Sequence, residues 1–93
     1  MAYAAFVQVE IDPDSDLGHR QSVLTQFVLS DLEELPGFRS AVWLNDGEGV
    51  GTCIVRFETE EQALRSLALL APVNGPKVIR AAACAVELEA QAP

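Results

Sequence analysis

The apolar residues of this 93-residue chain follow two alternating rhythms, and this alternation constrains the fold more than any other feature. Steps of two residues indicate a half-buried strand, and steps of three and four indicate an amphipathic helix. The rhythm predicts four strands, over Tyr3–Ile11, Ser40–Asn45, Gly51–Glu58 and Val78–Glu89. It predicts two helices, over Leu17–Leu35 and Glu60–Ala71. The order of elements is therefore β-α-β-β-α-β.

Turn-forming residues separate these elements at the expected places. Pro36-Gly37 ends the first helix, and Asp46-Gly47-Glu48-Gly49 supplies the turn of a β-hairpin. Thr59 and Gln62 have the spacing of a capping box, in which each residue satisfies a backbone N–H of the other. The boundaries of the elements are thus supported by local chemistry as well as by rhythm.

This order predicts one α+β domain over residues 1–93, with the ferredoxin-like split βαβ arrangement. Right-handed crossovers place both helices on one face of a four-stranded antiparallel sheet, with strand order 4-1-3-2. Cys53 and Cys84 would then flank the first strand, separated by two inter-strand steps of about 4.8 Å each. That separation exceeds the limit of about 7 Å for a disulfide, so two free thiols are expected.

Two helices cover only one face of such a sheet, and the other face is apolar as well. We expect the helices to cover an apolar set: Val7, Val9, Val42, Leu44, Val55, Phe57, Val86 and Leu88. We expect the open face to carry a mixed set: Phe6, Trp43, Ile54, Ile79, Ala81, Ala83 and Ala85, with Gln8, Glu10, Asn45 and Arg56. Apolar patches above a few hundred Å² usually mark an interface, which predicts a homodimer through the open sheet face. A monomer with a few surface hydrophobic residues is the alternative.

Charge and cysteine content exclude several classes of function. The 14 acidic and 6 basic residues give a net charge of −8, which disfavours nucleic acid and anionic membrane surfaces as partners. The longest apolar runs fall short of the about 20 residues that span a membrane. The two cysteines have no CxxC spacing and no neighbouring histidine, so neither a metal site nor a cofactor is expected. A cytoplasmic protein with reduced thiols fits this composition best.

A few side chains are candidates for a functional site. Trp43 and Asn45 share a strand face, where they either line a ligand pocket or serve as interface anchor and turn former. Arg56, in mid-strand, needs a partner, which is Glu10, a carboxylate of a second subunit or an anionic ligand. The candidate ligand-binding residues are Phe6 and Gln8 on the open face, and His19, the sole histidine.

Several short motifs resemble one known family. They are Pro36-Gly37-Phe38-Arg39-Ser40-Ala41, then Asp46-Gly47 and Val50, and then the segment from Cys53 to Ala63. The chain is similar here to the antibiotic-biosynthesis monooxygenase family of the dimeric α/β-barrel superfamily. That resemblance implies dimers whose sheets pack face to face. Some members oxidise aromatic polyketides with molecular oxygen and without metal or flavin, while others degrade haem, isomerise small compounds or have no known activity.

Two functional hypotheses follow. The first is a cofactor-independent monooxygenase or isomerase that acts on a small aromatic or polyketide-type compound, with Trp43, Asn45 and Arg56 as candidate catalytic residues. The second is a non-catalytic homodimer that binds a small ligand or has a structural role. The scarcity of titratable side chains along the last strand, where Ala82, Ala83 and Ala85 surround Cys84, favours the second.

Overall fold

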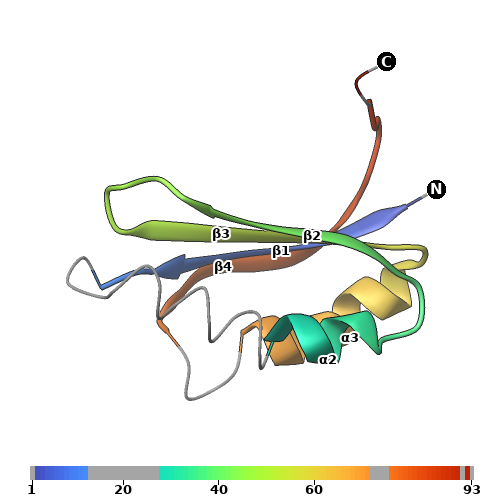
Figure 1. Ribbon diagram of the computed structural model, residues 1–93, viewed down its shortest axis with the longest axis horizontal. Coiled ribbons are helices and arrows are strands. Elements are labelled where there is room, and N and C mark those ends of the chain that lie inside the picture. The colour runs from blue at the N-terminus through green and yellow to red at the C-terminus, as the bar shows by residue number, and fades with distance from the viewer. Residues whose placement is uncertain (1, 13–27, 72–75, 91, 93) are drawn as a thin grey trace.

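The fold has two layers, a four-stranded sheet and a pair of helices on one of its faces (Figure 1). A computed structural model describes residues 2–12, 28–71, 76–90 and 92 of the chain. The strands are β1 (Tyr3–Glu10), β2 (Phe38–Asn45), β3 (Val50–Phe57) and β4 (Val78–Ala85). The helices are α2 (Ser30–Glu33) and α3 (Glu60–Leu70). The predicted α+β element order is confirmed over these residues.

The strands pair antiparallel in the order β2-β3-β1-β4, which is the predicted order counted from the other edge. β1 is central because β3 lies between it and β2 on one side, and the crossover from β3 through α3 places β4 on its other side. Cys53 lies opposite Val7 of β1, and Cys84 lies opposite Ala4. Neighbouring residues of a strand point to opposite faces, so the two thiols are on different sides of the sheet, and both are free.

The core lies between the sheet and the helices. Residues directly opposite each other in antiparallel strands share a face, and the central strands β1 and β3 contribute the most buried ones. Each of the following is at most 1% exposed: Ala5, Val7, Val55 and Phe57 from the strands, with Leu32 from α2 and Ala63 from α3. The Phe38 and Phe57 rings pack edge to face at 6.2 Å between centroids. We call this side of the sheet the covered face and the other side the open face.

The start of α3 contacts the turn at Gly37, which precedes β2. The capping box is confirmed: Thr59 Oγ1 accepts from Gln62 N, and Gln62 Oε1 accepts from Thr59 N at 3.1 Å. The Gln62 carboxamide also lies against Gly37, which has φ +77° and where a Cβ atom would displace the end of the Gln62 side chain. Gly37 O in turn accepts from Glu58 N at 3.1 Å. The Pro-Gly-Phe motif therefore has a structural explanation at this junction.

The predicted facing of β2 is wrong. Phe38 and Ser40 lie opposite the consecutive β3 residues Phe57 and Arg56, so Arg39 forms a one-residue bulge. After the bulge, Val42 is opposite Ile54 and Leu44 is opposite Thr52, and both point to the open face. Trp43, opposite Cys53, and Asn45, opposite Gly51, point to the covered face instead.

The prediction for the last strand is wrong in two respects. Ala81, Ala83 and Ala85 lie opposite Val7, Ala5 and Tyr3 on the covered face, and a register shift between Gln8 and Val9 leaves Val78 on the same face. The strand also ends at Ala85, four residues before Glu89. Residues 86–90 continue as a segment that rises from the sheet on the side away from the helices (Figure 1). We call these residues the C-terminal arm.

Candidate functional site

The structure divides the candidate residues between the two faces of the sheet. Trp43 and Asn45 lie on the covered face, whereas Arg56, Phe6 and Gln8 lie on the open face. The prediction that all of them share one face is therefore wrong, because the bulge of β2 sends Trp43 to the other side. His19 lies outside the described residues, as does most of the helix predicted over Leu17–Leu35, of which α2 forms the end.

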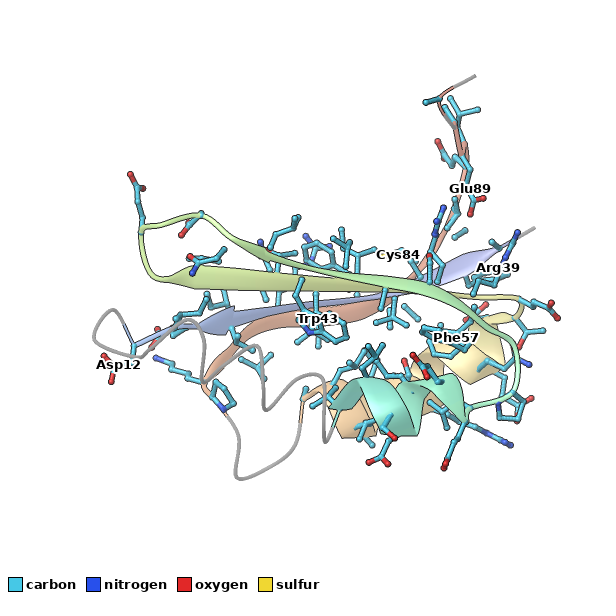
Figure 2. All side chains as sticks on the ribbon, in the orientation of Figure 1. Asp12, Arg39, Trp43, Phe57, Cys84 and Glu89 are labelled. Atoms are coloured by element: carbon cyan, nitrogen blue, oxygen red, sulfur yellow. The ribbon has the colours of Figure 1, made fainter. Side chains whose placement is uncertain are left out.

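Trp43 lies at the margin of the core, under β2 and on the side of the helices (Figure 2). It is half-buried and packs against the buried cluster, in the same row of the sheet as Cys53 and Val7. Burial raises the pKa of the Cys53 thiol to about 12, so this thiol is neutral at physiological pH. The buried cluster against which the indole packs, among the described residues, is hydrophobic, which suits stacking of an aromatic ring.

Asn45 and Asp46 shape the turn between β2 and β3. Asn45 Oδ1 accepts from Gly47 N at 2.8 Å, which is the contact that the turn-former interpretation predicts. Asp46 Oδ1 accepts from Glu48 N at 2.7 Å and from Val50 N at 3.0 Å. These backbone N–H groups lower the pKa of Asp46 because they stabilise the carboxylate. The side-chain oxygen of Asn45 is therefore already hydrogen-bonded within the turn between β2 and β3.

Arg56 forms a structural ion pair within the chain. Its Nε donates to Ser40 Oγ at 2.6 Å, and a terminal nitrogen lies 3.3 Å from Glu89 Oε1 in the C-terminal arm. The expected partner Glu10 is wrong: Glu10 lies 3.7 Å from Lys77 Nζ instead. Sequence reasoning missed Glu89 because it placed this residue in the last strand, whereas the arm carries it above the open face.

The open face is organised in rows that cross all four strands. One row is apolar: Val42, Ile54, Phe6 and Ala82. The next is mixed: Leu44, Thr52, Gln8 and Arg80. Gln8 Nε2 donates to Thr52 Oγ1 at 3.4 Å, and the Arg80 guanidinium stands 5.8 Å from the centre of the Phe6 ring. Val42 and Leu44 are 45% and 52% exposed, so this face has the mixed apolar and polar character of an interface.

A surface depression of about 260 Å³ lies elsewhere, at the junction of α2 and α3. It is lined by Leu35, Pro36, Thr59, Glu61, Gln62 and Arg65. None of the candidate residues lines it. Within the described ranges, no group of three or more His, Cys, Asp or Glu side chains is placed to hold a metal ion. No helix among those residues is long and apolar enough to cross a membrane.

Comparison with solved structures places this fold among known proteins. No protein-family model matches the sequence, and no curated protein matches it. The structure is similar to MupZ from Pseudomonas fluorescens, with a TM-score of 0.66, 15% identity, and coverage of 88% of this chain and 66% of MupZ. It is similar to Rv0793 from Mycobacterium tuberculosis, with a TM-score of 0.62, 18% identity, and coverage of 98% and 100%.

A third similar structure is a monooxygenase from the ActVA-Orf6 gene of Streptomyces coelicolor, in complex with the ligand Nanaomycin D. Its TM-score is 0.64 at 21% identity, and the match covers 99% of this chain and 92% of that one. This chain has the fold of these proteins. The resemblance found in the sequence is thereby confirmed at the level of the fold. The chain spans just under two thirds of the length of MupZ.

Proposed function

We propose that this protein binds a small aromatic or polyketide-type compound beside Trp43, between the sheet and the helices, and oxidises it with molecular oxygen. The observation that supports this most is the placement of the sole tryptophan at the margin of an apolar, uncharged core. The shared fold with a monooxygenase solved with a bound ligand supports it further. The proposed ligand stacks on the indole, and the Asn45 side-chain NH₂ donates to a ligand oxygen.

Such a reaction balances without an added cofactor when the substrate is a phenol. One oxygen atom of O₂ becomes the new carbonyl oxygen of a quinone. The other leaves as water with the phenolic hydrogen and one ring hydrogen, so the substrate supplies all the electrons. The protein then has to orient the ring and exclude bulk water. Those tasks need an apolar enclosure more than they need ionisable side chains.

The second part of the proposal is that the protein is a homodimer whose open faces pack together. Both described helices lie on the other side of the sheet, which leaves the apolar row of the open face without cover from a helix of its own chain. Sheet-on-sheet packing is the ordinary way to bury such a face. The paired polar groups, Gln8 with Thr52 and Arg56 with Ser40 and Glu89, would enter the interface already hydrogen-bonded.

A non-catalytic homodimer that binds a small ligand, or has a structural role, is the second candidate. It is favoured by the engagement of the polar candidates in structural contacts, Asn45 Oδ1 with Gly47 N and Arg56 with Glu89. Neither contact leaves a charged group aimed at a substrate. The two candidates differ in whether binding is followed by consumption of oxygen.

The test uses Trp43 as its own probe, because it is the sole tryptophan of the chain. Phenols and naphthols are titrated while indole fluorescence is followed, and oxygen uptake is measured on those that bind. We expect quenching with oxygen uptake, a tenfold or greater loss of affinity in Trp43→Ala, and much smaller loss in Trp43→Phe, which keeps an aromatic ring. Leu64→Ala, on the exposed side of α3, is the matched control and should bind normally.

Quenching without oxygen uptake would support the non-catalytic ligand-binding alternative. Affinity unchanged in Trp43→Ala, measured by calorimetry, would remove the site beside Trp43 from consideration.

A further inference from the structure

The residue that follows β1 fills a gap in the covered face. Gly51 of β3 lies opposite Asn45 of β2 and Val9 of β1, so these three residues form one row of that face. A Cβ atom at Gly51 would lie 2.6 Å from Cδ1 and 3.0 Å from Cγ1 of Ile11. The side chain of Ile11 therefore lies over Gly51, in the middle of the row, and takes the place of the side chain that Gly51 lacks.

The backbone of the hairpin turn fixes Ile11 and Asn45 relative to each other. Ile11 N donates to Gly49 O at 2.8 Å, which ties the half-buried Ile11 to the turn between β2 and β3. The same turn holds the Asn45 side chain, because Gly47 N donates to Asn45 Oδ1 at 2.8 Å. A group bound at Asn45 therefore meets the Ile11 side chain in a defined position.

This row borders the place proposed for the ligand. Trp43 belongs to the adjacent row of the covered face, two residues or about 7 Å along β2 from Asn45. A phenol stacked on the indole, with its oxygen toward the Asn45 NH₂ group, brings the ring positions beside its hydroxyl to the row that Ile11 fills. The row is closed by Ile11 on its inner side, whereas on its outer side β2 is the edge of the sheet.

We infer that Ile11 is a specificity-determining residue of the proposed site, which takes phenols with at least one hydrogen beside the hydroxyl. A single substituent beside the hydroxyl can point toward the edge of the sheet. With a substituent on each side, one of the two overlaps the Ile11 side chain whichever way the ring is turned. This inference rests on the ligand site proposed above and adds a limit on the substrates that it accepts.

The experiment compares two isomers that differ only in where their methyl groups lie. 2,6-Dimethylphenol has a methyl group on each side of the hydroxyl, whereas 3,5-dimethylphenol has none beside it. Dissociation constants are measured by NMR titration for the unsubstituted protein, for Ile11→Ala and for Ile11→Val, which removes only the Cδ1 methyl group. We expect the unsubstituted protein to bind the 3,5-isomer about tenfold more tightly, as for one methylene group too many in an apolar pocket. Ile11→Ala should reduce this ratio to less than threefold, and Ile11→Val should give an intermediate value.

Ile79→Ala is the matched control, because it makes the same truncation at a site of β4 that is 50% exposed, and it should keep the original ratio. Partial unfolding of a variant weakens both isomers equally, so the ratio is insensitive to it, and circular dichroism checks the fold. If both isomers bind more weakly to Trp43→Ala but Ile11→Ala keeps the ratio, or if the unsubstituted protein binds both equally, the ligand site stands and the role of Ile11 is overturned. If neither isomer binds the unsubstituted protein more tightly than Trp43→Ala, the site beside Trp43 and the role of Ile11 are both overturned.

Discussion

The two faces of the sheet are formed by the same four strands, but the described helices cover only one of them. On the covered face, Val55 and Phe57 are fully buried beneath the helices. On the open face, the apolar residues Val42 and Leu44 of the edge strand β2 remain about half exposed. The covered face is closed by residues of its own chain, so its burial contributes to folding of the monomer. The open face has a comparable apolar row, and neither of the described helices lies over it.

The two faces also differ in their polar groups. In the part of the chain that the structure describes, Ser66 is the one fully buried polar residue, and its Oγ donates to Ala63 O at 2.7 Å within α3. The open face carries Arg56 and Arg80, with Gln8 bonded to Thr52. A face that mixes apolar rows with hydrogen-bonded polar pairs is adapted to an interface, where solvent is removed only on association.

The largest expected difference between the faces concerns truncation of a large side chain. Phe57→Ala should lower the free energy of unfolding by about 3 to 5 kcal/mol, because it removes a fully buried ring that also packs against Phe38. Val42→Ala should cost less than about 1 kcal/mol, as expected for a half-exposed site. Urea unfolding at low protein concentration, where association contributes least, measures both. Equal losses would contradict the distinction between the faces.

A smaller effect is expected at the junction that holds the helix layer in place. Gly37 and Gly47 both have φ +77°, but only at Gly37 would a Cβ overlap the Gln62 side chain, whereas Gly47 has open space. Gly47→Ala should therefore cost about 1 to 2 kcal/mol, the penalty for a left-handed residue. Gly37→Ala should cost about 1 kcal/mol more than that, because the flexible Gln62 side chain must turn away and give up its hydrogen bond from Thr59 N.

Thermal unfolding is measured for the two glycine variants, with Gln62 intact and with Gln62→Ala. This comparison isolates the effect of the contact between the new Cβ atom and the Gln62 side chain. The difference between them should shrink when Gln62 is truncated. A cost at Gly37 that matches the cost at Gly47 in both backgrounds would show that the Gln62 contact is unimportant.

The smallest effect at neutral pH concerns the two thiols, one on each face. Cys53 is buried on the covered face and Cys84 is exposed on the open face. A thiol reagent at pH 8 should therefore modify Cys84 quickly and Cys53 only as fast as the protein unfolds. If the open face forms the dimer interface, Cys84 should react faster in Val42→Glu than in the unsubstituted protein. Equal rates for the two thiols would contradict their assignment to different faces.

The same thiol gives a pH dependence with a definite sign. The pKa of Cys53 is raised from 9.0 to about 12 in the folded protein. Its contribution to stability is fully present below pH 9 and is lost as the pH rises toward 12, because the unfolded chain releases the proton first. Stability of the unsubstituted protein should fall more steeply over this range than that of Cys53→Ala, as measured by urea unfolding.

The sequence was sufficient to predict the topology, because each element has a rhythm of its own and a turn or cap at its boundary. The capping box at Thr59 and Gln62 formed as predicted. The facing of β2 was not predictable, because both of its alternating sets are apolar. Val42 and Leu44 stand on one side, and Ala41 and Trp43 stand on the other. Hydrophobicity therefore does not indicate which set faces the helices. The bulge at Arg39 decides it, and no residue type marks that bulge in the sequence.

The prediction that the candidate residues form one site is wrong for the same reason. Once Trp43 was assigned to the wrong side, it was grouped with Arg56 and Phe6, from which the sheet separates it. The partner of Arg56 was missed because the alternation of β4 continues past Ala85 in the sequence, although the chain leaves the sheet there. A periodic pattern predicts which residues share a side, but it does not reveal where a strand stops being paired.

The bulge at Arg39 gives β2 one residue more than its partner strand requires. Loss of that single residue would leave an unbroken alternation, with Phe38 still on the covered face and Val42 still on the open face. Loss of any one residue from Ala41 to Asn45 would instead move part of the strand from one face of the sheet to the other. Arg39 is thus a residue that β2 could lose without any change in which of its other residues face each side of the sheet.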